Sequence, residues 1–163
     1  MGIVSFFKEA GQKLFGQKEA EPAVSDPAEK QARVAAANDK AAKAIEAYIA
    51  SQKLSAQGLQ VEFDGATGTV TVAGQAEDQA TRERIVLCCG NVHGVHAVND
   101  LMTVLQKTQE SRFYSVVSGD TLSGIAKTQY GKANAYMKIF EANKPMLSDP
   151  DKIYPGQVLR IPA

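Results

Sequence analysis

The chain of 163 residues carries 18 basic and 18 acidic side chains, and 44 % of its residues are apolar. This composition is typical of one ordinary domain or of two small ones. The balanced charge argues against a broad attraction to nucleic acid or to an anionic membrane, and the lack of Trp argues against a base-stacking surface. The sequence shows no apolar stretch near the roughly 20 residues of a membrane span and no export signal. We expect a cytoplasmic protein that has no nucleic-acid or membrane partner and acts as a monomer.

The first 40 residues combine a short apolar pattern with a polar stretch. Apolar residues at helical spacing predict a short amphipathic helix within residues 1–16. These residues are Ile3, Phe6, Phe7, Ala10 and Leu14. Residues 17–40 are rich in Ala and in charge, and Asp26 followed by Pro27 is typical of a helix start. We predict a linker that passes into a surface helix.

Residues 41–106 alternate between helical and extended patterns. One helical face is formed by Ile45, Tyr48 and Ile49. Apolar and polar residues then alternate around the turn-forming segment 64–68, which predicts a hairpin. A helical pattern returns at 76–89, and a final strand is predicted at about 95–105. The predicted order is helix, hairpin, helix, strand.

The last third of the chain has a different pattern. Residues 107–112 are polar and predict a second linker. Within residues 113–163, the pattern predicts a strand near Tyr114, two short helices and a last strand over 158–161. The sequence therefore predicts an α+β protein of two small domains, the second with the order βααβ.

Two segments resemble known domain families. The second domain resembles the LysM module, and the motifs are Tyr114-x-Val116-x-x-Gly119-Asp120-Thr121-Leu122, Tyr130-Gly131 and Ile153-x-Pro155-Gly156-Gln157. Residues 41–106 resemble a BON domain, and the motifs are Val70-x-Val72-x-Gly74 and Gly94-Val95-x-x-Val98-x-Asp100. In this order, behind a short N-terminal helix, the two resemble a family of small cytoplasmic bacterial proteins that bind potassium. The resemblance implies that K⁺ is the ligand and that the protein becomes compact on binding it.

The stretch LCCGNVHGVH holds every cysteine and histidine of the chain, Cys88, Cys89, His93 and His96. A soft-metal site is one interpretation of this cluster. Adjacent residues on a helix diverge by about 100°, so Cys88 and Cys89 do not converge easily on one ion. We favour cysteines packed in the core and histidines in a solvated loop.

The backbone of the same stretch offers a different kind of site. The predicted helix ends at Gly90, its last carbonyls lack partners within the helix, and Gly94 turns the chain again. From the residues alone, an ordinary glycine-capped helix end is the plainer interpretation. The resemblance implies that main-chain carbonyls hold the ion, namely those of Gly90, Val92 and Val95 in this turn and of Phe7 and Ala10 in the first helix. Neutral carbonyls suit potassium, whose charge density is low.

Two other functions remain open from the sequence. In LysM modules, glycans containing N-acetylglucosamine bind beside the loop that here holds Gly119, Asp120, Thr121 and Leu122, which makes peptidoglycan a candidate ligand. Asp120 and Thr121 are also suited to capping the following helix. A scaffold or chaperone-like role is the remaining alternative. The sequence lacks a nucleophile motif of the G-x-S-x-G type and a glycine-rich phosphate loop, so we predict that it is not an enzyme.

Overall fold

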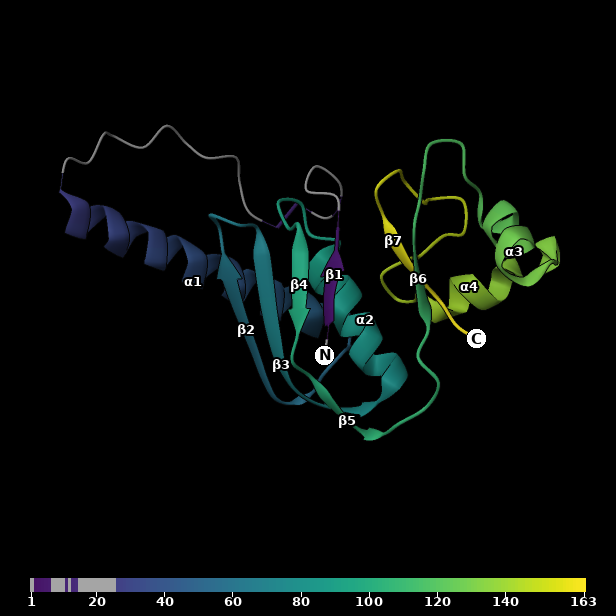
Figure 1. The fold of residues 1–163 in the computed structure, drawn as a ribbon, viewed down its shortest axis with the longest axis horizontal. Coiled ribbons are helices and arrows are strands. Elements are labelled where there is room, and N and C mark those ends of the chain that lie inside the picture. The colour runs from purple at the N-terminus through teal and green to yellow at the C-terminus, as the bar shows by residue number, and fades with distance from the viewer. Residues whose placement is uncertain (1, 7–10, 12, 15–25) are drawn as a thin grey trace.

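The computed structural model describes residues 2–6, 11, 13–14 and 26–163. These residues form two lobes that lie side by side (Figure 1). The first lobe is a sheet with helices α1 (Pro27–Ser51) and α2 (Gln79–Gly90) packed on one face. The second lobe, residues 112–163, is a small βααβ unit. The predicted α+β class with two small domains is confirmed.

The sheet of the first lobe has strands β1 (Gly2–Ser5), β2 (Gln57–Asp64), β3 (Thr69–Asp78), β4 (Ala97–Asp100) and β5 (Thr103–Gln106). Its order is β1-β4-β3-β2, and β5 pairs with the end of β3 beyond β4. The hairpin of β2 and β3 is antiparallel, as predicted, whereas β4 and β5 both run parallel to β3. The buried side of the sheet is lined mainly by valines: Val61, Val70, Val72 and Val98.

The final strand of this lobe differs from the prediction. One strand over 95–105 was expected, but the chain breaks between β4 and β5 at Leu101 and Met102. A buried carboxylate causes the break, because Asp100 Oδ1 accepts a hydrogen bond from the Met102 backbone N–H at 2.9 Å. Asp100 is also held by Arg82, whose Nε donates to Oδ2 at 2.9 Å. The bend seats the Met102 side chain in the core.

The N-terminal segment also differs from the prediction. Residues 2–5 form β1, which pairs antiparallel with β4 from Gly2↔Asp100 to Ser5↔Ala97, so the predicted helix within residues 1–16 is wrong for them. The physical reason is that β4 would otherwise leave the backbone groups of one edge unpaired. Phe7 and Ala10 lie outside the described residues.

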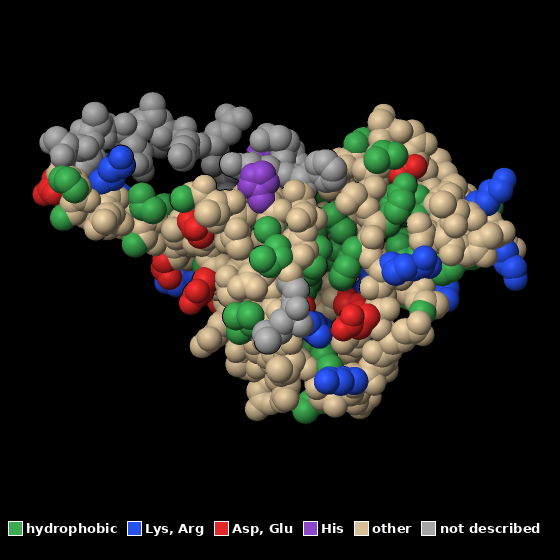
Figure 2. Space-filling view, in the orientation of Figure 1, with side chains coloured by type: hydrophobic (Ala, Val, Ile, Leu, Met, Phe, Trp, Pro, Cys, Tyr) green, Lys and Arg blue, Asp and Glu red, His purple; other side chains and the backbone are tan. Residues whose placement is uncertain are grey.

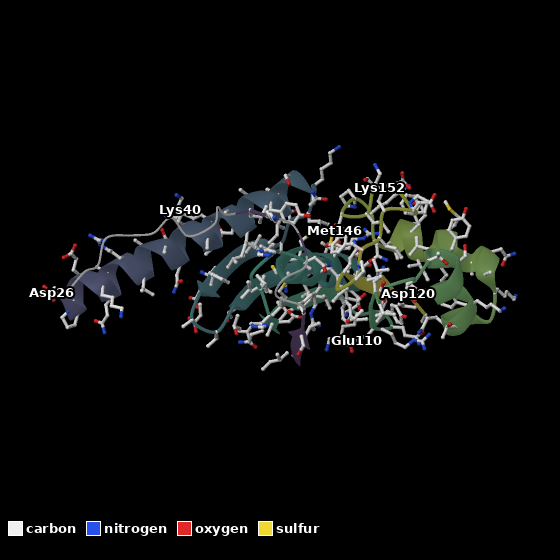
Figure 3. All side chains as sticks on the ribbon, turned by 90° about the horizontal axis from the view of Figure 1, so that it is seen from above. Asp26, Lys40, Glu110, Asp120, Met146 and Lys152 are labelled. Atoms are coloured by element: carbon white, nitrogen blue, oxygen red, sulfur yellow. The ribbon has the colours of Figure 1, made fainter. Side chains whose placement is uncertain are left out.

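A single helix, α1, spans the position where the linker and the first domain were expected to meet. It starts as predicted, with the Asp26 carboxylate accepting from Ala28 N–H at 2.9 Å and Pro27 in the first turn. The part before about Lys40 extends beyond the sheet, with Asp26 at its free end (Figures 1 and 3). Its buried residues begin only at Ala41. The change from a surface helix to a packed helix therefore takes place within one element.

The second lobe consists of β6 (Arg112–Ser115), α3 (Leu122–Tyr130), a short 3₁₀ turn η1 (Ala133–Ala135), α4 (Tyr136–Ala142) and β7 (Val158–Ile161). Strands β6 and β7 pair antiparallel, which confirms the βααβ order. A separate apolar core fills this lobe, formed by Val116, Leu122, Ile125, Ala126, Ile139, Phe140, Leu147, Leu159 and Ile161. Among the described residues, no helix has the length and apolar character needed to cross a membrane.

Candidate functional site: the turn after helix α2

The helix α2 lies between the two lobes and ends at the candidate turn. Its last helical residue is Gly90, and the Asn91 backbone N–H closes the helix by donating to the Leu87 carbonyl at 2.9 Å. Gly90 is therefore not the left-handed residue after the helix that the sequence suggested. A side chain is excluded there for another reason, because a Cβ on Gly90 would lie 1.9–2.2 Å from atoms of the Phe6 ring.

Residues 91–96 form a tight turn that joins α2 to β4. Gly94 has a φ of +96°, which favours glycine, and Val95 N–H donates to the Val92 carbonyl at 3.1 Å. No described residue donates a hydrogen bond to the carbonyls of Gly90 or Val95. Among the described residues, the Val92 carbonyl accepts only this bond from Val95, and a carbonyl oxygen can accept through two lone pairs. Gly90, Val92 and Val95 are buried, so these carbonyls belong to a protected turn.

The N-terminal segment lies against this turn at two points. The Phe6 backbone N–H donates to the His96 carbonyl at 2.6 Å, while its ring covers Gly90. Gly11, with a φ of +113°, comes so close to the Asn91 carbonyl that a Cβ on Gly11 would lie 2.1 Å from that oxygen. The two predicted ligands Phe7 and Ala10 fall between these contacts in sequence, outside the described residues. The described residues on either side of them, Phe6 and Gly11, thus both lie against the turn.

The cysteines and the histidines lie in different surroundings. Cys88 and Cys89 are buried in the core of the first lobe, as predicted, and burial raises the pKa of the Cys88 thiol to about 12 and that of Cys89 well above its ordinary value. His96 is exposed and His93 is half-buried. Figure 2 shows histidine at the surface above the sheet. Within the described part of the chain, no three His, Cys, Asp or Glu side chains are grouped to hold a metal ion.

The opposite side of α2 contacts the second lobe through polar groups. Glu83 forms a buried ion pair with Arg160 of β7 and accepts from the Ser111 backbone N–H at 2.9 Å. At the end of the helix, the Asn91 side chain bonds to the backbone of Val158. In Figure 3, Met146 lies in the loop that meets the first lobe beside this junction. The sequence analysis did not identify Asn91 or Glu83 as interface residues.

The predicted glycan-binding loop has structural roles in this fold. Thr121 caps α3 as predicted, because its Oγ1 accepts from Gly124 N–H at 3.1 Å. Asp120 does not cap the helix. Its Oδ2 accepts from Val117 N–H at 2.9 Å and from the Tyr114 hydroxyl at 2.8 Å, which closes the turn after β6. Leu122 is buried in the second core, and Gly119 turns the loop with a φ of +89°.

Comparison with known proteins places both lobes in families. Residues 29–106 match the BON domain and residues 114–162 match the LysM domain. The chain is 42 % identical over 162 residues to the potassium binding protein Kbp of Escherichia coli O6:H1, a match that covers 99 % of both chains. A segment of 49 residues is 51 % identical to an uncharacterized protein of Deinococcus radiodurans, of which it covers 19 %. The chain therefore belongs to the family of BON–LysM proteins that includes Kbp.

Proposed function

We propose that this protein binds potassium through the backbone carbonyls of the turn after α2 and of the N-terminal segment that lies on it. The relative matched along 99 % of both chains is named as a potassium binding protein. The proposal assigns the ion to the carbonyls of Gly90, Val92 and Val95, completed by those of Phe7 and Ala10.

The observation that carries the proposal is a cluster of buried neutral acceptors at the end of α2. From the described residues, the Gly90 and Val95 carbonyls receive no hydrogen bond and the Val92 carbonyl receives one. They lie near the negative end of the helix dipole, which favours a cation. Residues 90–98 contain no carboxylate, and neutral carbonyls are suited to replacing the water shell of a large monovalent ion.

On this proposal the protein is a cytoplasmic ion-binding protein rather than an enzyme. The two segments that supply the carbonyls are brought together only in the folded first lobe. Potassium therefore binds the ordered state and stabilises it by mass action. Without the ion, the carbonyls repel one another, so the N-terminal segment and the turn are less ordered.

A thermal unfolding series tests the proposal. Potassium-free protein is titrated with KCl and, in parallel, with NaCl at the same ionic strength. We expect a melting temperature that rises with KCl in a saturable way and a smaller rise with NaCl. Equal responses to the two salts would refute potassium binding at this turn.

A further inference from the structure

Two asparagine side chains bind the backbone of β7 in the same way. Arg160 donates from its backbone N–H to Asn143 Oδ1 at 2.7 Å, and its carbonyl accepts from Asn143 Nδ2 at 2.8 Å. Val158 donates to Asn91 Oδ1 and accepts from Asn91 Nδ2, both at 2.9 Å. Each amide thus forms a two-bond ring with one residue of β7, as an adjacent strand would. These side chains complete the edge of β7 that β6 leaves unpaired.

The two asparagines belong to different domains. Asn143 ends α4 of the LysM domain, so its pair with Arg160 forms within that domain. Asn91 ends α2 of the BON domain and lies 67 residues from Val158 in sequence. The pair of Asn91 with Val158 therefore exists only while the two domains are docked.

Asn91 also lies inside the proposed ion site. Its neighbours in sequence, Gly90 and Val92, are two of the proposed ligands. Its backbone N–H closes α2, its carbonyl lies against Gly11, and its side chain is buried at 3 % exposure. One residue therefore touches the helix end, the N-terminal segment and the LysM domain.

We propose that Asn91 is the positioning residue that couples potassium binding at the 90–95 turn to docking of the LysM domain, through its amide pair with Val158. This inference rests on the proposed function. A turn held by the ion keeps the Asn91 amide aligned with Val158, and a docked Val158 in turn keeps the carbonyls of Gly90 and Val92 in place. Coupling of this kind is reciprocal, because the factor by which potassium favours docking equals the factor by which docking favours potassium binding. A variant that loses the amide pair should therefore bind potassium more weakly.

Hydrogen exchange on the unmodified protein tests the coupling with a control inside the same strand. The Val158 amide reports the pair between domains, and the Arg160 amide reports the matching pair within the LysM domain. When NaCl is replaced by KCl at equal ionic strength, we expect the protection factor of the Val158 amide to rise about tenfold. The protection factor of the Arg160 amide should rise by less than about fivefold. Equal changes at the two amides, or an unchanged Val158 while Val95 gains protection, would overturn the inference.

A pair of full-length variants provides an independent test. Asn91→Ala removes both bonds to Val158. Asn91 lines a cavity of about 90 Å³ together with Tyr48 and Tyr154 among others. Truncation of the Asn91 side chain would extend this cavity toward Val158, so we expect water to satisfy the freed peptide group and the variant to fold. Arg84→Ala is the matched control, because Arg84 donates from α2 to the LysM carbonyls of Ala142 and Glu141 without touching the turn.

We expect Asn91→Ala to weaken potassium binding about five- to thirtyfold in calorimetric titration, and Arg84→Ala by less than about twofold. Equal losses would assign the effect to docking in general and overturn the role of Asn91. If the unmodified protein showed no potassium-specific response at Val95 or in its melting temperature, the proposed function itself would fail. A potassium response of the unmodified protein that Asn91→Ala retains in full would refute only the coupling.

Discussion

Gly90 is required because the Phe6 ring packs against it, and not because of its own backbone conformation. A methyl group there would overlap the Phe6 ring, so in a Gly90→Ala variant the ring must leave the helix. We expect the free energy of unfolding to fall by about 1–3 kcal/mol, as for other overpacked core positions. Because Phe6 anchors the segment that completes the proposed site, the potassium-specific rise in melting temperature should shrink as well.

Gly124→Ala is the matched control for this prediction. It is also a glycine within a helix, but its Cβ would meet only Thr121 Oγ1, at 3.2 Å. Chemical unfolding should place this variant within about 1 kcal/mol of the unmodified protein, because alanine favours helix and the single contact is tight. A Gly90→Ala protein with unchanged stability and unchanged potassium response would show that Phe6 does not hold the N-terminal segment in place.

Glu83 gives the contact between the domains a dependence on pH. Burial alone would raise the pKa of Glu83, but hydrogen bonds from Arg160, Ser111 and Gln79 outweigh it and hold the pKa below its ordinary value. A carboxyl group with a lowered folded-state pKa contributes stability above its unfolded-state pKa, about 4.3. That contribution is lost as the pH falls through the folded-state pKa.

We therefore expect Glu83→Gln to reduce the free energy of unfolding at pH 7 by roughly 2–4 kcal/mol, because Arg160 loses its buried partner. The difference from the unmodified protein should shrink as the pH falls below about 4.3. Denaturant unfolding between pH 3 and pH 7 measures both effects. Glu29→Gln, which breaks only the exposed pair with Arg33, serves as the control. A Glu83→Gln deficit that stays constant over this range would refute the assignment.

The cysteines and histidines of the turn test the carbonyl site against a soft-metal site. A variant with Cys88→Ala, Cys89→Ala, His93→Gln and His96→Gln lacks every cysteine and every histidine of the chain. We expect it to lose about 2–4 kcal/mol of stability from the two buried thiols and still to show the potassium-specific rise in melting temperature. Folded variant protein that no longer distinguishes KCl from NaCl would favour side-chain ligands over carbonyls.

At the level of elements, the N-terminal segment is the part of the structure that a pattern of side chains predicted least well. Ile3 and Phe6 fit a helical stripe, yet residues 2–5 pair with β4. Helical spacing reports only local preference, whereas the open edge of β4 is a feature of the assembled sheet. Alternation on either side of the turn-forming segment 64–68, by contrast, predicted the hairpin, because both strands carry their apolar residues on one buried face.

The burial of helix α2 was also predicted only in part from the local pattern. Helical spacing places Ile85, Cys88 and Val92 on one face, but Val86 and Leu87 are buried as well. The second buried face arises because β7 and the N-terminal segment cover the helix. A local sequence pattern does not predict contacts between residues so far apart in the chain. For the same reason, the local sequence did not predict that the Asn91 side chain binds the backbone of Val158.

The N-terminal segment also provides the prediction at this scale. Deletion of residues 1–12 removes β1, the Phe6 ring and both proposed ligands of the segment. We expect the remaining chain to keep its helical circular dichroism, because α1 and α2 pack on the sheet without β1. The potassium-specific rise in melting temperature should be abolished. Retained potassium affinity would remove Phe7 and Ala10 from the proposed site.

For the whole molecule, the arrangement of contacts along α2 links the proposed ion site to overall shape. Glu83, Arg84 and Asn91 all bond to the second domain from this helix. The same helix carries Gly90 at its end, with the N-terminal segment over it.

The two domains should therefore separate more often when the turn is disordered than when the ion holds it. Small-angle X-ray scattering in KCl and in NaCl of equal ionic strength measures this directly. We expect the curve in KCl to match the docked arrangement of Figure 1 and the curve in NaCl to give a larger radius of gyration. Asn91→Ala in KCl should resemble the unmodified protein in NaCl, because the turn and the LysM domain are then no longer joined. Identical curves in the two salts, together with a potassium-specific rise in melting temperature, would confine the effect of the ion to the first domain.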